Sequence, residues 1–131
     1  MLEQVLHLMH LSPHHRAYTV DTVLRCIAPP IHLDQHIGVE RNGQLVAWAS
    51  WAWLTQGKAD AFLAGEYKIQ PGDWRSGDTL VIMDFIAPNG DARALHRTLR
   101  NLFATLPTDI LPGATWVRFA KRGRIGTANN G

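Results

Sequence analysis

The feature that most constrains the fold of this chain is an apolar run, residues 79–87, that contains one carboxylate and ends at a Pro-Asn-Gly turn. The run has the composition of a buried strand, and the turn opens an amphipathic segment, 91–106, with apolar residues at helical spacing. The carboxylate, Asp84, lies between Met83 and Phe85. Because a buried acid destabilises the fold unless it is paired with another group or serves a function, we expect Asp84 to have a partner from another part of the chain.

The best candidate for that partner lies far upstream, in the segment 12–16, which reads Ser-Pro-His-His-Arg. A histidine and an aspartate brought together in one site are the components of an acid–base catalyst. Two structural alternatives stay open at this point. His15 fits equally well as a surface-loop histidine that caps the next segment, and Asp84 as a structural carboxylate that accepts hydrogen bonds from loop amides.

A hairpin signal defines the other side of the expected sheet. Asn-Gly at 42–43 is the strongest short signal of this kind, and it separates two strand-like runs, 36–41 and 45–53. Further helices are expected over 2–11, 20–27 and 58–65, with the Pro-Pro pair at 29–30 beyond the end of the second, and a last strand over 114–120. This order predicts an α+β, layered α/β fold with one mixed central sheet flanked by helices.

The size and composition fit one domain. The chain has 131 residues, 46% of them hydrophobic and 18% charged, which is typical of a globular protein. We expect a single domain over 1–122 and a flexible tail over 123–131, where Gly, Thr, Ala and Asn have little to bury. The net charge of +2 is too small to indicate nucleic acid by itself. Four basic residues gather near the end: Arg118, Lys121, Arg122 and Arg124.

A single cysteine, Cys26, excludes a disulfide within the chain and favours a reducing compartment. It lies in a helical run, so a buried structural thiol is preferred over a nucleophile. The first residues lack the basic and then apolar pattern of a signal peptide, and the longest apolar-rich stretch, 45–54, is too short to cross a bilayer. We therefore expect a cytoplasmic protein without a membrane span.

A metal site is not predicted. His7 and His10 lie three residues apart on the first expected helix, but no third ligand stands at a fixed offset from them. Solvent-facing histidines are the simpler interpretation of this pair.

Four short motifs stand in a fixed order along the chain: Ser12-Pro13-x-His15-Arg16, Ala49-Ser50-Trp51-Ala52, Asp73-Trp74-x-Ser76-Gly77-Asp78, and Asp84-Phe85-Ile86-Ala87-Pro88-x-Gly90-Asp91. Their order and approximate spacing, from about residue 6 to residue 119, resemble those of the toxin-activating lysine acyltransferases. These are the hemolysin-activating proteins that accompany RTX toxins.

The resemblance implies a fold, an activity and roles for two residues. The fold is expected to be similar to that of the GNAT acetyltransferases. The implied activity is transfer of a fatty acyl group from acyl carrier protein to the ε-amine of an internal lysine of a protoxin. No bound cofactor is expected, the donor being the phosphopantetheine thioester of the carrier, and family members commonly form homodimers. The family's catalytic histidine falls on His15 and its catalytic aspartate on Asp84.

The implied reaction needs a base. The acceptor amine is an ammonium at neutral pH, because the reference pKa of lysine is about 10.4, so it must lose a proton before it attacks a thioester. An imidazole is suited to take that proton, and a buried carboxylate can fix the imidazole tautomer. A covalent route, in which a residue first takes the acyl group, is the alternative, and nothing in the sequence requires it.

Five further residues are candidates for substrate binding. Ser12 and Arg16 are expected to support the catalytic pair. Trp51 is a candidate for the lining of an acyl slot, although core packing is the simpler role for a tryptophan. The turn at Asn89 and Gly90 would hold a phosphate of the phosphopantetheine arm at a helix N-terminus. The aspartate that follows argues against this, since its charge would repel a phosphate, and it fits a capping role equally well.

Two departures from the family pattern leave points open. The chain ends about where the last common strand ends, so the usual C-terminal extension is expected to be missing. His14 stands beside His15, so the sequence does not decide which imidazole acts.

A second function therefore stays open: a short, non-catalytic homologue, of the kind carried by a phage or another mobile element, that acts by binding a protein partner. Nucleic-acid binding is not expected, because the basic charge is local and no recognition helix is evident.

Overall fold

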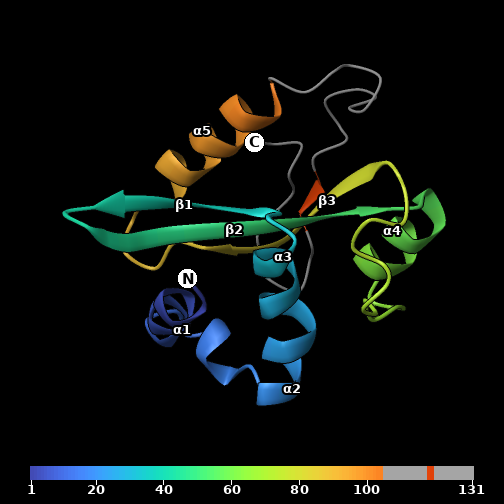
Figure 1. Cartoon of the computed structure of the whole chain (residues 1–131), viewed down its shortest axis with the longest axis horizontal. Helices are drawn as coiled ribbons and strands as arrows, with labels where there is room; N and C mark the ends of the chain where they lie inside the picture. Colours follow the sequence, from blue (N-terminus) through green and yellow to red (C-terminus); the bar gives the residue numbers. More distant parts are fainter. Residues whose placement is uncertain (105–117, 120–131) are drawn as a thin grey trace.

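A mixed four-stranded sheet forms the centre of the protein in the computed structural model, which describes residues 1–104 and 118–119 (Figure 1). The strands are β1 (His36–Arg41), β2 (Gln44–Leu54), β3 (Thr79–Ile86) and β4 (Arg118–Phe119), and they lie in this order across the sheet. Strand β2 is antiparallel to both β1 and β3, and β4 is parallel to β3. The α+β arrangement around a mixed sheet that the sequence predicts is therefore confirmed.

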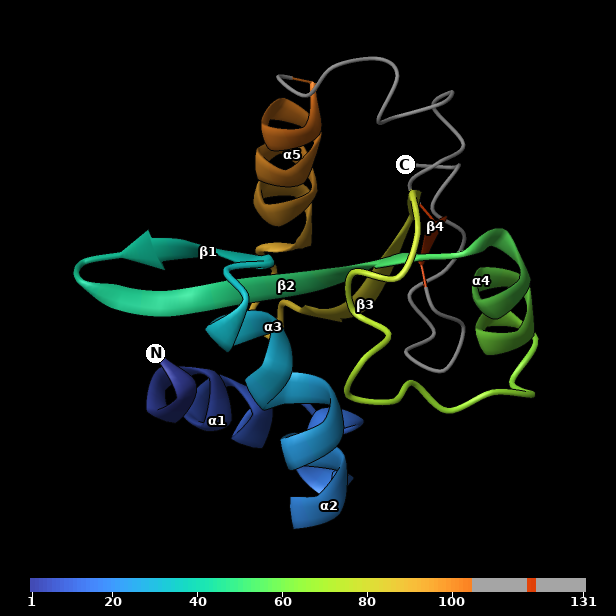
Figure 2. The same ribbon diagram turned by 45° about the vertical axis from the view of Figure 1, so that its right-hand side comes forward.

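Helices cover both faces of this sheet. They are α1 (Leu2–His10), η1 (His15–Ala17), α2 (Val20–Thr22), the π-helical η2 (Val23–Ile27), α3 (Ala28–His32), α4 (Gln56–Leu63) and α5 (Ala92–Phe103). In both views α5 stands on the opposite side of the sheet from α1, α2 and α3 (Figures 1 and 2). We call the two sides the α5 face and the N-terminal face.

The hairpin between β1 and β2 forms where the sequence predicts it. Asn42 and Gly43 have positive φ angles of 54° and 77°. Two consecutive positive φ angles are typical of the tight turns whose twist matches antiparallel strands, and Asn-Gly adopts them at little cost. The first strand has the predicted bounds, and the second extends one residue further at each end, over Gln44–Leu54.

Alternation along the strands divides the core between the two faces. On the α5 face, Ala49 and Trp51 of β2 pack with Leu80 of β3 and with Leu95 and Phe103 of α5. On the N-terminal face, Trp48 and Ile86 pack with three residues of α1: Val5, Leu8 and Met9. Trp48 and Trp51 lie on opposite faces because side chains of a strand alternate.

A β-bulge in β3 determines which face carries Asp84. Ser50 of β2 is opposite Asp84, but the next residue, Trp51, is opposite Ile82, so Met83 is an extra residue without a cross-strand partner. Met83 packs with residues of the N-terminal face, and Asp84 shares that face with its partner Ser50. Strict alternation from Ile82 onward would have placed Asp84 on the α5 face.

Several of the predicted helix boundaries differ from the structure; α4, for example, covers Gln56–Leu63 where the sequence predicts 58–65. The helical stretch that starts at Val20 does not end before Pro29 and Pro30, because both prolines lie at the start of α3, which continues to His32. Proline is tolerated in a first helical turn, where its missing N–H would have no partner within the helix. The long helix is shorter than predicted and ends at Phe103.

Other predictions fall in part outside the described residues. These are the last strand over 114–120, of which the structure describes Arg118–Phe119, the basic cluster around it, and the tail over 123–131. Cys26 is fully buried, as the sequence predicts. Within the described part of the chain, every helix is too short or too polar to cross a membrane.

Candidate active site

His15 and Asp84 meet in the interior of the N-terminal face, although they come from distant parts of the chain. His15 begins the short helix η1, and Asp84 lies near the end of β3. His15 Nε2 is 3.4 Å from Asp84 Oδ1. The exposed fractions of the two residues are 4% and 2%. The structure thus brings together the two residues that the sequence pairs as an acid–base device.

The loop after α1 orients the imidazole. The backbone N–H of Arg16 donates to the carbonyl of Ser12 at 2.9 Å, which closes a turn around residues 12–16. Ser12 Oγ then lies 2.7 Å from His15 Nδ1. A carboxylate only accepts hydrogen bonds, so the ring nitrogen that faces Asp84 carries the proton in the neutral imidazole. The other nitrogen, Nδ1, is then an acceptor for the Ser12 hydroxyl.

Two hydroxyl groups near Asp84 are functional candidates that sequence reasoning missed. Tyr18 Oη donates a 2.7 Å hydrogen bond to Asp84 Oδ1, and its ring lies 5.2 Å from the ring of His15. Ser50 is fully buried opposite Asp84, and its hydroxyl has no hydrogen-bond partner among the described residues. The signals that could have found them are a tyrosine three residues after His15 and a lone serine inside the apolar run of β2.

The structure also distinguishes the two adjacent histidines. His14 is exposed, and its ring meets the ring of His15 edge-on at 4.9 Å. His15 is buried and paired with Asp84, its Nε2 lying 3.4 Å from Asp84 Oδ1. The geometry therefore favours His15 as the acting imidazole, with His14 packed against it.

The remaining predicted site residues are not all gathered at this pair. Arg16 is exposed on η1. Trp51 is buried on the α5 face, where its ring meets that of Phe103 at 4.9 Å, so it lies on the other side of the sheet from Asp84. That placement supports the core-packing alternative for Trp51.

The turn between β3 and α5 keeps two of the predicted residues at the surface. Asn89 and Gly90 are exposed, and Gly90 has a φ of +89° with no atom within 4 Å of the position a Cβ would take. The expectation that Asp91 caps α5 with its side chain is wrong, because that side chain makes no capping hydrogen bond. It is buried and forms an ion pair with Arg41 of β1, which offsets the negative charge that argued against a phosphate here.

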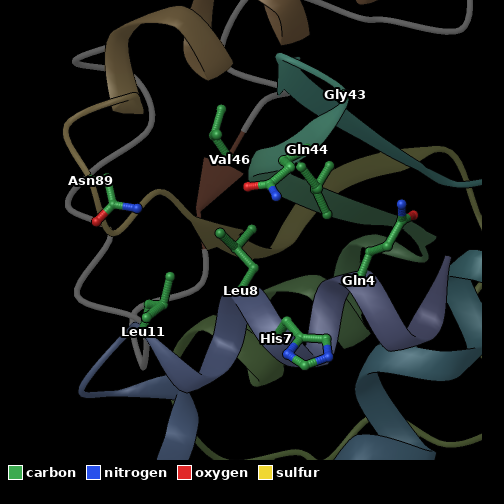
Figure 3. Close-up of a pocket in the computed structure, with 9 residues that line it drawn as sticks. Gln4, His7, Leu8, Leu11, Gly43, Gln44, Val46 and Asn89 are labelled. Atoms are coloured by element: carbon green, nitrogen blue, oxygen red, sulfur yellow. The ribbon is translucent and has the colours of Figure 1, made fainter.

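A hollow of about 450 Å³ lies beside this turn (Figure 3). In the close-up, Asn89 from the turn lies at one side, Gln4 of α1 at the other, and Leu8 between them. Gln44 and Val46 of β2 complete the upper wall. The hollow thus combines an apolar floor with amide side chains from three separate segments.

A second hollow, of about 480 Å³, opens on the α5 face. Trp51, Trp53 and Phe103 supply its apolar lining, and Gln35 and Arg75 supply polar groups. Trp51 therefore borders a hollow, as the acyl-slot hypothesis requires, but this hollow lies on the opposite side of the sheet from His15.

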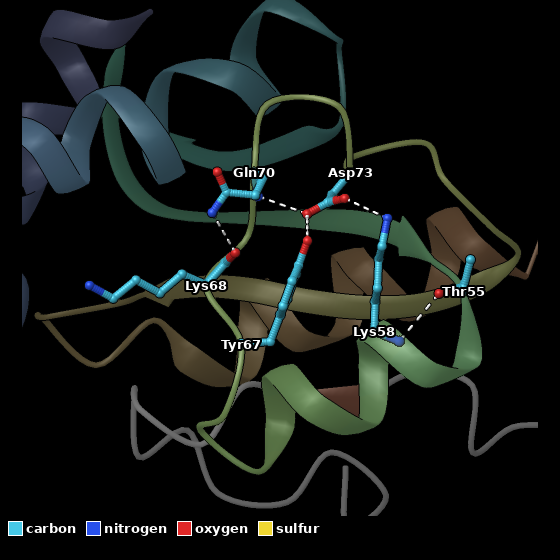
Figure 4. Close-up of polar contacts among 6 residues, drawn as sticks. All are labelled: Thr55, Lys58, Tyr67, Lys68, Gln70 and Asp73. Carbon is cyan, nitrogen blue, oxygen red and sulfur yellow. Dashed lines mark hydrogen bonds and ion pairs between the residues drawn. The ribbon is translucent and has the colours of Figure 1, made fainter.

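The loop before β3 is fixed by a buried carboxylate, Asp73 (Figure 4). It accepts hydrogen bonds from Lys58 Nζ at 2.7 Å, Tyr67 Oη at 2.5 Å and the N–H of Gln70 at 2.8 Å. Burial alone would raise the pKa of Asp73, but these three donors outweigh burial and hold the pKa below its ordinary value. The same hydrogen bonds raise the pKa values of Lys58 and Tyr67.

The histidines of α1 do not form a metal centre with other described residues. His7 and His10 are exposed, as expected, and His7 Nε2 lies 3.9 Å from a carboxylate oxygen of Glu3. Within residues 1–104 and 118–119, no group of three or more His, Cys, Asp or Glu side chains is placed to hold a metal ion.

The arrangement at His15 has the parts that a general base requires. A neutral imidazole offers Nδ1 as an acceptor, and a buried carboxylate at Nε2 stabilises the positive charge that the ring gains when it takes a proton. The hydroxyl of Tyr18 holds that carboxylate in place. The site is therefore suited to remove a proton from a nucleophile that approaches from the Ser12 side.

Comparison with known proteins agrees with the motifs. A protein-family model described as the RTX toxin acyltransferase family matches residues 1–116. The RTX-II toxin-activating lysine-acyltransferase of Actinobacillus pleuropneumoniae is 33% identical over 110 residues, which are 84% of this chain and 67% of that protein. A lysine-acyltransferase of Vibrio cholerae is 37% identical over 101 residues, 76% of this chain and 66% of that protein.

A third relative gives the same result over a shorter stretch. The protein-lysine myristoyltransferase of Escherichia coli is 34% identical over 92 residues, 70% of this chain and 53% of that protein. The matches thus span between about half and two thirds of the length of these three relatives. The chain belongs to the RTX toxin acyltransferase family.

Proposed function

We propose that this protein is a protein-lysine acyltransferase that moves a fatty acyl group from acyl carrier protein to the ε-amine of a lysine in a protoxin. Family membership supports the class of reaction, since the relatives are named toxin-activating lysine-acyltransferases and a protein-lysine myristoyltransferase. The observation that carries the proposal is the buried pair His15 and Asp84, whose Nε2 and Oδ1 atoms are 3.4 Å apart.

In this mechanism His15 is the general base. The lysine ammonium first releases one proton to solvent; His15 Nδ1 then takes a second proton from the amine nitrogen as it attacks, and Asp84 stabilises the imidazolium that forms. The amine nitrogen bonds to the thioester carbonyl carbon, and the carbon–sulfur bond breaks. The proton held by His15 then passes to the departing sulfur, which leaves as the thiol of the carrier.

Ser12 is proposed to stand at the entrance to the base. His15 Nε2 is enclosed on the Asp84 side, whereas Ser12, at Nδ1, is half-buried. The incoming amine therefore approaches from the Ser12 side. Ser12 Oγ either passes the proton to Nδ1 or is displaced by the amine, and in both cases it keeps Nδ1 free of a proton until substrate binds.

The donor is proposed to enter along the turn between β3 and α5. Gly90 leaves its outer side open, and the ion pair between Arg41 and Asp91 offsets the charge that would repel a phosphate. The topology supports a GNAT-like fold, because three antiparallel strands are followed by a helix and a parallel strand. The cytoplasmic location and the homodimer stay predictions.

The test is an acylation assay with defined components. The protein is incubated with myristoyl-acyl carrier protein and the RTX-II protoxin of Actinobacillus pleuropneumoniae, and the intact mass of the protoxin is measured. We expect the mass of an acyl group to be added, and His15→Ala and Asp84→Asn to slow transfer by about 10²–10⁴-fold, the usual contribution of a general base. His10→Ala is the matched control, since His10 is exposed on α1.

Full activity of folded His15→Ala and Asp84→Asn proteins would contradict the proposed roles. If the wild-type protein binds this protoxin but transfers no acyl group to it, the non-catalytic alternative is the correct function.

A further inference from the structure

The exposed side of α5 carries a row of arginines. Arg93, Arg97 and Arg100 are all exposed, and their spacing of four and three residues places them on one side of the helix. Leu95, Leu99 and Phe103 of the same helix are buried against the sheet. We call Arg93, Arg97 and Arg100 the arginine stripe. At 1.5 Å per residue it is about 10 Å long.

The positive charge of this stripe is not offset by nearby acids. Helix α5 itself contains no Asp or Glu. None of the three arginines forms an ion pair with another residue of the described chain. Burial and then the charge of Arg100 lower the pKa of His96, which lies on the same helix. The one acid at the start of α5, Asp91, is buried and paired with Arg41.

The stripe is connected to Asp84 through the turn between β3 and α5, residues 87–91. Asp84 lies two residues before the end of β3, and the exposed turn with Asn89 and Gly90 leads from there into α5. Helix α5, which carries the stripe, stands on one side of the sheet (Figure 2), whereas Asp84 lies opposite Ser50 on the N-terminal face. A partner bound at the stripe would therefore need a flexible arm that rounds the turn to bring a reacting group to His15.

We propose that the arginine stripe is the docking surface for the acidic carrier protein that delivers the acyl group. This inference rests on the proposed function, which supplies a donor held on a flexible arm. An acidic helix of the carrier lies along the stripe, and the arm passes the open side of Gly90. Amide side chains at the hollow beside the turn, Gln4, Gln44 and Asn89, are placed to meet the amide groups of the arm.

The observations favour an acidic protein over a nucleic acid. The three arginines cover one short helix, and the net charge of the whole chain is only +2. The exposed side of α5 carries no aromatic residue on which a base could stack. A short row of charges of this kind is typical of protein interfaces, in which complementary charge steers association.

The experiment measures carrier binding and carrier use separately. Binding of fluorescent holo-acyl carrier protein is followed by anisotropy at low and high salt, for the wild-type protein and for Arg93→Glu/Arg97→Glu/Arg100→Glu. We expect the triple variant to bind at least about tenfold more weakly, a loss of about 1.4 kcal/mol, because three favourable charge contacts become repulsive. The wild-type affinity should fall as salt screens the contact, and that of the variant should not.

Kinetic constants provide the second readout. For the triple variant we expect a higher KM for myristoyl-acyl carrier protein, with kcat and the rate with myristoyl-pantetheine unchanged, because the small donor does not need the stripe. Arg93→Lys/Arg97→Lys/Arg100→Lys should retain most of the carrier affinity. The matched single variants are Arg97→Glu and Lys68→Glu, of which only the first should weaken carrier binding.

The outcomes separate this inference from the proposed function. Wild-type KM and carrier affinity in the Glu variant would show that the stripe is not the docking surface, even if acyl transfer is present. Absence of transfer from every donor by the wild-type protein would overturn the proposed function. Even then, weaker binding of holo-acyl carrier protein by the triple Glu variant than by the wild-type protein would support the stripe as the docking surface. Salt-dependent binding of a short DNA duplex, with no binding of the carrier, would assign the stripe to nucleic acid instead.

Discussion

The carboxylate of Asp84 is held by a hydrogen bond that does not come from His15. Tyr18 Oη donates to Asp84 Oδ1 at 2.7 Å, and the same tyrosine packs its ring against His15. Tyr18→Phe keeps the ring and removes the donor. We expect kcat/KM for acyl transfer to fall by about tenfold or more, because hydrogen bonds to charged groups contribute about 1.5–3 kcal/mol.

Circular dichroism is the control for this variant, since the ring contact should preserve the fold. An unchanged rate in a folded Tyr18→Phe protein would show that Asp84 does not depend on this donor.

The sequence was sufficient to pair His15 with Asp84 and to place Ser12 beside them, but not to find Tyr18 and Ser50. An acid inside an apolar strand is conspicuous, and a histidine in a Ser-Pro loop is a natural partner. The sequence pattern shows Ser50 only as a small residue within an apolar strand. Its position opposite Asp84 is known only from the strand register. From the sequence, Tyr18 would be interpreted as a core aromatic residue, because the amino-acid pattern does not show where its hydroxyl points.

At the scale of single elements, the bulge at Met83 offers a direct test of geometry. Deleting Met83 would restore regular pairing between β2 and β3 and leave Asp84 on the N-terminal face, but without the bend that aims it. We expect the deletion to slow acyl transfer by about 10²-fold, since a displacement of about 1 Å at a reacting group can have that effect.

The matched variant for the deletion is Met83→Leu, which keeps the bulge and nearly the same volume. Its rate should stay close to that of the wild-type protein. Wild-type activity in a folded deletion variant would show that the bulge has no part in positioning the carboxylate.

The loop before β3 should make stability depend on pH. The pKa of Asp73 is held below its ordinary value of 3.8 by donors that outweigh its burial, so its contribution is fully present above that value and is lost as pH falls through the lower folded pKa. We expect Asp73→Asn to lower the urea midpoint at neutral pH, and the difference from the wild-type protein to shrink as pH falls below the ordinary pKa of 3.8.

Equilibrium urea unfolding at several pH values measures this difference. A gap between the two proteins that stays constant from neutral to strongly acidic pH would mean that the charge of Asp73 does not stabilise the loop.

The boundaries of helices and strands were predictable where they depend on the φ preferences of one or two residues. The turn at Asn42 and Gly43 follows from the ease with which these residues adopt positive φ. The end of the second helix was not predictable in the same way. Two consecutive prolines normally end a helix. Here η2 ends at Ile27, and Pro29 and Pro30 lie in the first turn of α3, so the helical segment continues to His32.

For the whole molecule, the layer arrangement was predictable and the division of residues between the layers was not. Alternation places Trp48 and Trp51 on opposite faces, as expected for a strand. The face of Asp84 depends on one unpaired residue in β3, which no periodicity reveals. The resemblance to a family supplied the pairing of His15 with Asp84 independently of that register.

Helix α5 stands on one side of the central sheet (Figure 1), and His15 and Asp84 meet on the other. Two macromolecules that bind on opposite sides of such a barrier do not exclude one another. Under the proposed function and docking surface, the protein, the carrier and the acceptor would form a ternary assembly, in which only the thioester arm passes around the edge of the sheet. Both partner proteins would then stay bound while the acyl group moves from the carrier to the lysine.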